Sequence, residues 1–201
     1  MKRISMGNTR QPMQTKLACL TALFLTVALW AADAPRAIDP QQSVLTVHVL
    51  KAGLFSAFGH EHEIRAPIQQ GSFTTQDPSV ELTVNARELR VMDKDVSDKD
   101  RAEIQATMLG SKVLDSERFS VIRFRSTAVT PAADDKWIVQ GELTVHGETR
   151  PVKFVVALQN GHYHGTAEIK QKDFGITPVT VGGGTVRVKN ELRVEFDIVG
   201  E

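Results

Sequence analysis

The sequence predicts an all-β protein: an antiparallel sheet of about eight strands that closes on itself, with one short helix near residues 98–109. Two observations lead to this prediction. Apolar and polar residues alternate through most of the chain after residue 44, which is the period of a strand with one buried face. Short turn signals such as Asn160-Gly161 separate several of these segments, and such turns join antiparallel neighbours. A sandwich of two sheets would show the same alternation and is the alternative.

The first 34 residues lack this alternation. Basic residues come first, an uncharged apolar run from Leu17 to Trp30 follows, and small residues occupy positions 31–34. This order is typical of a secretory signal peptide, so we expect residues 1–34 to be removed by cleavage within 31–34. An uncleaved anchor is the alternative, although the run is shorter than the ~20 residues of a spanning helix. Residues 35–201 would then form a single domain.

The strand segments each place apolar residues on one face. Pro67 interrupts the second segment and predicts an edge or a bulge there, because proline cannot donate a backbone hydrogen bond. Asn190 breaks the apolar face of the last segment. Representative residues of the apolar faces are Leu45, Val47, Val80, Leu82, Val84, Ile122, Phe124, Ala128, Leu143, Val145, Phe154, Val156, Leu192, Val194, Phe196 and Ile198.

One segment has helical rather than strand spacing. Ser97 and the acidic residues after it are suited to the N-terminus of a helix. Ile104 and Met108 then recur at a spacing of four residues, and Gly110 is placed to end the helix.

Composition and motifs argue against several function classes. No nucleophile elbow, glycine-rich phosphate loop or zinc-protease motif is present, so we expect no enzyme activity and no cofactor. Without residues 1–34 the chain keeps 20 basic and 23 acidic residues, a net charge of −3. No basic stripe stands out, so we expect no nucleic-acid partner.

The segment Phe55–Ile64 combines aromatics with two closely spaced histidines, His60 and His62. In a strand these histidines would point the same way and could chelate a metal ion, but the sequence identifies no further ligands for it. The other four histidines fall on the solvent-facing side of their segments, so we predict no metal site. The pair would instead be polar groups at the mouth of an apolar interior, or part of an exposed loop.

Three motifs resemble those of the YceI-like family. The run Gly141–Val152 is similar to its G-x-L-T-x-x-G-x-T-x-P-V hairpin. Val113–Phe119, leading into Ile122–Thr127, resembles its F-F-D-x-x-x-(Y/F)-P-x-I-x-F-x-S-T stretch, and Lys172–Ile176 is similar to its S-D-F-G-I element. In chain order the three motifs lie between residues 113 and 176, within the domain predicted after residue 34.

The resemblance implies a lipocalin-like barrel whose members are exported and hold a polyisoprenoid or other lipid. We therefore expect a periplasmic, non-enzymatic protein that binds an isoprenoid, a prenyl quinone or a fatty chain. A homodimer and transient contact with the membrane surface are further options. A metal- or redox-associated accessory protein that uses His60 and His62 is the alternative function. The predicted ligand-binding residues are Phe55, Phe58, His60, His62, Ile64, Phe124, Leu143, Phe154, Val156, Leu192, Val194 and Phe196.

The chain also departs from the family pattern. Ile104–Met108 stands where the family commonly carries R-D-x-H-L, so the arginine, aspartate and histidine are all absent. If those groups contact a ligand head elsewhere in the family, His60 and His62 are the substitutes that this sequence offers.

Overall fold

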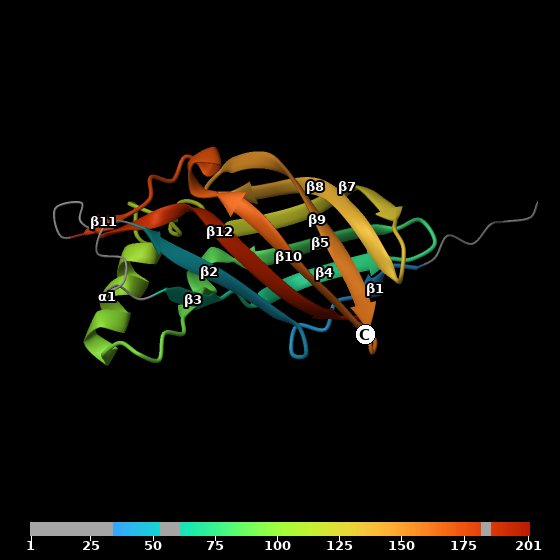
Figure 1. The fold of residues 1–201 in the computed structure, drawn as a ribbon, viewed down its shortest axis with the longest axis horizontal. Coiled ribbons are helices and arrows are strands. Elements are labelled where there is room, and N and C mark those ends of the chain that lie inside the picture. Colours follow the sequence, from blue (N-terminus) through green and yellow to red (C-terminus); the bar gives the residue numbers. More distant parts are fainter. Residues whose placement is uncertain (1–33, 53–60, 182–185) are drawn as a thin grey trace, which may run out of the picture. The chain divides into compact units, whose positions relative to one another are not determined.

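A computed structural model describes residues 34–52, 61–181 and 186–201 of the chain. These residues form one antiparallel sheet, one α-helix and two short 3-10 helices (Figure 1). The strands are β1 (Arg36–Ala37), β2 (Val44–Ala52), β3 (His62–Arg65), β4 (Ile68–Thr74), β5 (Ser79–Asn85), β6 (Arg90–Val91), β7 (Val121–Pro131), β8 (Lys136–Val145), β9 (Glu148–Gln159), β10 (His162–Lys170), β11 (Thr180–Val181) and β12 (Val186–Val199). The helices are η2 (Ala86–Glu88), α1 (Asp98–Leu109) and η3 (Gln171–Phe174).

The sheet closes into a barrel. Its long strands neighbour one another in the order β4-β5-β7-β8-β9-β10-β12-β2-β3, and only Ala66 and Pro67 separate β3 from β4. Because β3 pairs with β2 at one end of this order and β4 pairs with β5 at the other, the short link between β3 and β4 closes the ring. The sheet has 12 strands, of which β1, β6 and β11 have only two residues each. If β3 and β4 are counted as one bent strand, the barrel has eight long strands. The predicted antiparallel barrel is confirmed, and the two-sheet sandwich is excluded.

Pro67 explains the bend between β3 and β4. Proline has no N–H to donate to a ladder, so continuous pairing with one neighbour is interrupted there. Before it, β3 pairs with β2; after it, β4 pairs with β5. The resulting gap between β4 and β12 is bridged by the segment after β1. There the backbone N–H of Ile38 donates to Gly71 O at 2.9 Å and that of Asp39 donates to Val199 O at 2.8 Å.

Two irregularities interrupt the strand pairing, and the first of them alters a predicted face. The prediction that Ala128 faces inward is wrong, because a register shift between Ser126 and Ala128 reverses the alternation. Ala128 is exposed, and the partly buried Val129 packs on the core instead. A second irregularity lies in β12 between Val188 and Leu192, around Asn190, whose side-chain oxygen accepts a hydrogen bond from the Lys172 backbone.

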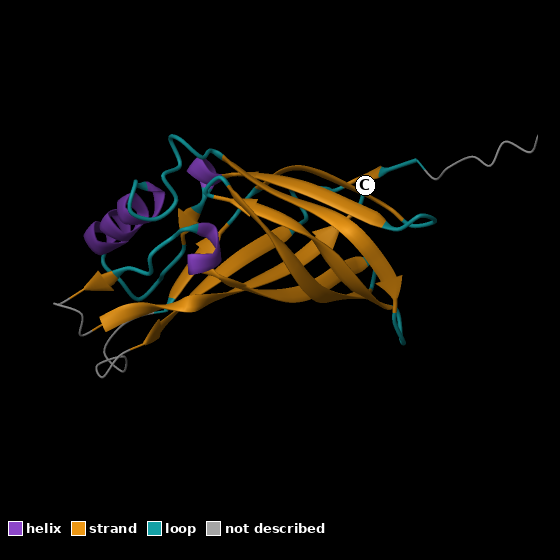
Figure 2. Ribbon diagram, turned by 90° about the horizontal axis from the view of Figure 1, so that it is seen from above, coloured by secondary structure: helices purple, strands orange, loops and turns teal. Residues whose placement is uncertain are grey.

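The predicted helix is confirmed as α1. The Ser97 hydroxyl caps it by accepting a hydrogen bond from the Asp100 N–H at 3.1 Å, and Gly110 follows its last residue. Gln105 ties the helix to the β6 region, because its side-chain oxygen accepts from the Val91 N–H at 2.9 Å and its amide donates to Leu89 O at 2.8 Å. Figure 2 shows α1 at one end of the barrel. Within the described ranges, no helix has the length and apolarity needed to cross a membrane.

Candidate ligand-binding cavity

The barrel encloses a cavity of about 700 Å³. This volume lies within the range of ~300–1,000 Å³ that is typical of small-molecule sites. Its wall is aliphatic because the inward positions of the strands carry branched apolar side chains. These wall residues are Leu45, Val47, Val49, Ile64, Leu82, Val84, Ile122, Leu143, Val145, Val152, Ala167, Ile169, Leu192 and Val194.

A layer of aromatic rings forms the floor of this cavity. The rings of Phe124 and Phe154 lie 5.4 Å apart between centroids, and those of Phe154 and Phe196 lie 5.3 Å apart. Glycines in the adjacent strands make room for them. A Cβ at Gly141 would lie 2.6 Å from the Phe124 ring, and a Cβ at Gly165 would overlap Phe196. Any larger residue at either position would therefore push a floor ring away from the sheet.

A smaller cavity of about 140 Å³ lies beyond this floor. Phe124 and Phe154 border both cavities, so the two spaces are separated by these rings. Besides Phe124 and Phe154, the aromatic residues that line the smaller cavity include Phe73, Trp137 and Tyr163. The Tyr163 ring contacts the rings of Phe73 and Trp137 at centroid distances of 5.1 and 6.1 Å. These ring contacts narrow the space beyond the floor to the smaller cavity.

The polar lining of the large cavity gathers at the end that α1 covers. Polar residues come from α1 and the segment just before it, from the end of β2, from the starts of β3 and β12, and from η3. They are Lys51, His62, Asp95, Ser97, Asp100, Glu103, Thr107, Gln171 and Arg187. A ligand with an apolar chain and a polar head would therefore fit this cavity with its head at the α1 end and its chain toward the floor.

His62 is the best-positioned polar group at this end. β6 pairs with β3, and this pairing brings Asp93, just after β6, beside His62. The Nδ1–H of His62 donates to Asp93 Oδ2 at 2.6 Å, and the other carboxylate oxygen accepts from the Glu63 N–H at 2.8 Å. The Asp93 side chain is only 4% exposed and that of His62 is 24% exposed. Asp93 therefore fixes the tautomer and orientation of the ring and leaves Nε2 for a ligand.

The D-F-G-I motif closes part of the same end. η3 stops at Phe174 because Gly175 adopts a left-handed conformation with φ 71°, which lets the chain reverse. Phe174 and Ile176 are both buried, and both line the large cavity. The motif thus contributes two apolar side chains to the wall beside the polar residues.

The structure places the predicted ligand-binding residues in three groups. His62, Ile64, Leu143, Leu192 and Val194 line the large cavity. Phe124, Phe154 and Phe196 form the ring layer of the floor. Phe124 and Phe154 border both cavities, whereas Phe196 and Val156, which both pair with Gly165, line only the smaller one. Phe55, Phe58 and His60 lie outside the described residues. Whether any of these residues binds a ligand stays a prediction.

Sequence reasoning missed Asp93 and the polar residues on and just before α1. Asp93 lies in an irregular segment and 31 positions from His62, so no local pattern links them. The alternation did indicate that His62 shares a face with Ile64 and Ala66, and both of these are buried. Among the described residues, His62 is not part of any group of three potential metal ligands.

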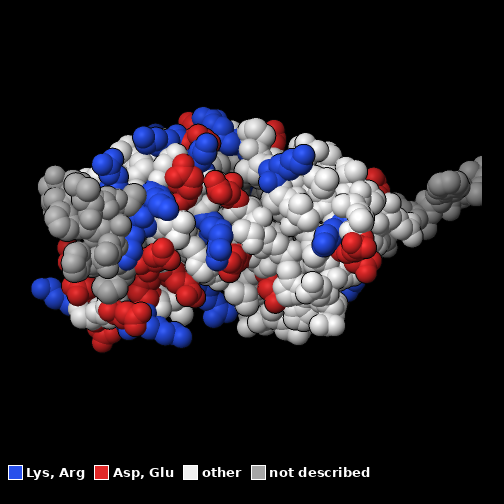
Figure 3. All heavy atoms as spheres, viewed as in Figure 1, with Lys and Arg blue, Asp and Glu red and all other residues white. Residues whose placement is uncertain are grey.

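The charged side chains are mixed in sign on the face shown in Figure 3. Lysine and arginine residues alternate with aspartate and glutamate residues, and most of them gather toward the end with α1. No extended patch of one sign appears among the described residues in this view.

Comparisons with known proteins point to one family. The model of the YceI-like domain matches residues 37–200. A UPF0312 protein of Vibrio cholerae is 31% identical over 127 residues, which are 58% of this chain and 61% of that relative. The alignment thus spans less than two thirds of the relative's length. A UPF0312 protein of a Shewanella species is 24% identical over 191 residues, 89% of this chain and 95% of the relative.

The crystal structure of Burkholderia cenocepacia BcnA has a similar fold. It superposes with a TM-score of 0.58 at 20% sequence identity and covers 80% of this chain and 98% of its own. At this identity the similarity concerns the fold alone.

Proposed function

This chain belongs to the YceI-like family, and from that premise we propose that it is an exported, non-enzymatic protein that holds a long-chain apolar lipid. The observation that carries the proposal is the cavity of about 700 Å³, with an aliphatic wall and an aromatic floor. An isoprenoid, a prenyl quinone or a fatty chain has the length and apolarity that such a space accommodates. Its head group would lie near His62 at the polar end.

The wall can supply enough energy for this binding. Each buried methylene contributes ~0.8 kcal/mol, so a tail of about ten methylenes contributes roughly 8 kcal/mol before the costs of association. Association costs at least ~4 kcal/mol of this gain, so longer tails, which bury more methylenes, would bind more tightly. Contacts to the head group would therefore select among lipids rather than supply most of the affinity.

The polar end supports binding more than catalysis. His62 hydrogen-bonds to Asp93, and no hydroxyl among the described residues hydrogen-bonds to His62. Ser97, a hydroxyl residue that lines this end, accepts a hydrogen bond from the Asp100 N–H as the cap of α1. Among the described residues, this histidine and aspartate therefore lack the nucleophile that a hydrolytic site requires. They do make a rigid polar contact for a ligand.

The cellular setting belongs to the same proposal. The basic, apolar and small segments of residues 1–34 support export to the periplasm. There the protein would carry its lipid, with a second copy or the membrane surface as further partners and without nucleic acid.

We expect the protein to carry lipid when it is isolated from its own periplasm. Native mass spectrometry under gentle conditions should show an added lipid mass in a 1:1 complex, which organic extraction removes. The extracted protein should then take up a prenyl quinone of similar length. An empty cavity in the isolated protein, together with no uptake of prenyl quinones or prenyl phosphates, would contradict the proposal.

A His62→Ala variant should lose selectivity for the head group but keep its affinity for the chain. The variant lacks one hydrogen-bonding group, which contributes about 0.5–1.5 kcal/mol, so we expect a loss of up to about tenfold. The measurement compares a prenol with a hydrocarbon of equal length in parallel titrations. The loss should appear for the prenol alone.

His48→Ala is the matched control. His48 also hydrogen-bonds to a carboxylate, that of Glu195 at 3.2 Å, but it does not line the cavity. The affinity for the prenol relative to that for the hydrocarbon should stay unchanged in His48→Ala. If it changes as much as in His62→Ala, His62 does not recognise the head group.

A further inference from the structure

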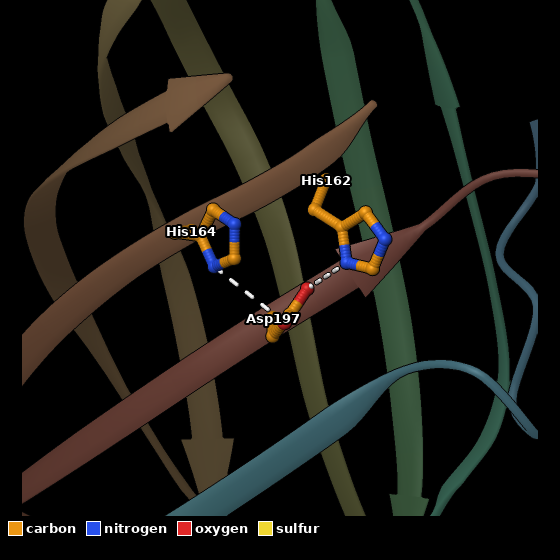
Figure 4. A group of neighbouring side chains, drawn as sticks. All are labelled: His162, His164 and Asp197. Atoms are coloured by element: carbon orange, nitrogen blue, oxygen red, sulfur yellow. Dashed lines mark hydrogen bonds and ion pairs between the residues drawn. The ribbon is translucent and has the colours of Figure 1, made fainter. Parts of the chain in front are cut away.

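The outer face of the barrel carries a cluster of two histidines and one aspartate. β10 and β12 are antiparallel neighbours, and His164 lies directly opposite Asp197 in their register. His162 is two residues before His164, so both histidines point to the same face of β10. That face is the outer one, because Tyr163 between them and Ile198 beside Asp197 line the smaller cavity. Figure 4 shows both imidazole rings directed toward the carboxylate.

The spacing of the three side chains is close to that of metal ligands. His162 Nδ1 lies 2.8 Å from one oxygen of Asp197, and His164 Nδ1 lies 3.6 Å from the other. One nitrogen of each histidine and one carboxylate oxygen of Asp197 lie within 4.8 Å of one another. Ligands about 2.0–2.2 Å from a tetrahedral ion are roughly 3.3–3.5 Å apart, so small side-chain rotations would suffice.

The two rings are already arranged in parallel. Their planes differ by 11° and their centroids lie 5.8 Å apart, because adjacent residues on one face of a strand hold them side by side. The hydrogen bond from His162 to Asp197 requires a proton on the imidazole Nδ1, where a bound ion would replace that proton. The strand geometry therefore presents both rings to the carboxylate before any ion binds.

The surroundings of the cluster leave room for an ion. The side chains of His162 and His164 are each 41% exposed and that of Asp197 is 37% exposed, so water can fill the remaining coordination positions. Among the described residues, the ion pairs of Asp197 are to these two histidines alone, and no lysine or arginine neutralises its carboxylate. Two nitrogen ligands and one oxygen ligand suit Zn²⁺ or Cu²⁺, whereas Mg²⁺ and Ca²⁺ prefer oxygen ligands.

We propose that His162, His164 and Asp197 form a binding site for a transition-metal dication, Zn²⁺ or Cu²⁺, on the outer face of the barrel. The three residues do not line the lipid cavity, and the site does not use His62. An ion held there links β10 to β12 through their side chains, so it stabilises the folded state in proportion to the logarithm of its concentration.

Titration calorimetry with zinc chloride, on protein prepared without a polyhistidine tag, tests the site. One ion per chain should bind to the wild type. His162→Ala, His164→Ala and Asp197→Asn should each weaken binding by more than about tenfold, because even loss of an outer-shell partner costs ~10–100-fold. Copper chloride should compete for the same site, and magnesium chloride should not.

His48→Ala and His62→Ala serve as matched controls. Each of these histidines hydrogen-bonds to a carboxylate, but neither belongs to a group of three potential ligands among the described residues. Both variants should bind zinc as the wild type does. Binding that is lost in His62→Ala but kept in Asp197→Asn would overturn the proposal, and so would a wild type that binds no zinc.

A thermal unfolding experiment separates loss of the ion from loss of the fold. The three ligands are partly exposed, and surface substitutions usually change stability by less than ~0.5 kcal/mol, so the variants should fold. Zinc should raise the melting temperature of the wild type and leave that of Asp197→Asn unchanged. An equal rise in both proteins would contradict the assignment. Lipid loading of Asp197→Asn should match the wild type, so this test stands apart from the proposed lipid binding.

Discussion

An Ala167→Phe variant is expected to bind a long-chain lipid about a hundredfold more weakly than the wild type while it remains folded. Ala167 lies on β10 and lines the large cavity, so a phenyl ring there would occupy space that the lipid chain needs. If the ring excludes about four methylenes, the lost burial is roughly 3 kcal/mol, which is about a hundredfold in affinity. Fluorescence titration with a prenyl quinone would measure the loss.

Thr166→Phe provides a control on the same strand. Thr166 is exposed on the outer face, opposite Glu195 of β12, so its ring would point away from the cavity. This variant should bind the quinone as the wild type does. Comparable affinities for the two variants would show that the lipid does not enter the cavity at β10. The melting temperature of Ala167→Phe should stay near that of the wild type, because the new ring enters a cavity rather than a filled core.

The secondary structure was largely predictable because its signals are local. Ser97 and Gly110 mark the two ends of α1, and both act as expected in the structure. The Asn160-Gly161 turn connects β9 and β10, and both of its residues have positive φ angles, as a two-residue hairpin requires. Pro67 marks the position where one long strand changes partners. In each case one or two residues specify the backbone geometry, so the sequence alone reveals it.

The candidate sites were less predictable because they depend on pairings between distant segments. The alternation of the sequence placed His162 and His164 on the outer face, but no local pattern indicated that Asp197 contacts both of them. That proximity follows from the register of β10 on β12, in which His164 pairs with Asp197. Asp93 reaches His62 only because β6 pairs with β3. The bulge in β7 that turns Ala128 outward likewise depends on its partner strand.

A Phe124→Ala variant should lose about 3–5 kcal/mol of the free energy of unfolding. Phe124 is 6% exposed, and its ring packs against Phe154 in the aromatic floor. Truncation of a buried phenylalanine removes its transfer free energy and leaves a cavity, which together account for a loss of this size. Urea unfolding of the lipid-free protein would measure the change. Phe124→Leu, which keeps much of the side-chain volume, should lose clearly less.

The same variant should accept longer lipids. Phe124 borders both the 700 Å³ and the 140 Å³ cavities, so its removal joins them into one deeper space. Two more buried methylenes would contribute ~1.6 kcal/mol, or more than about tenfold in affinity. Titration with a series of chain lengths, compared within each protein, should therefore show the optimum moving to longer chains in Phe124→Ala. An unchanged optimum would mean that the lipid does not reach the floor, and that its length is limited at the polar end.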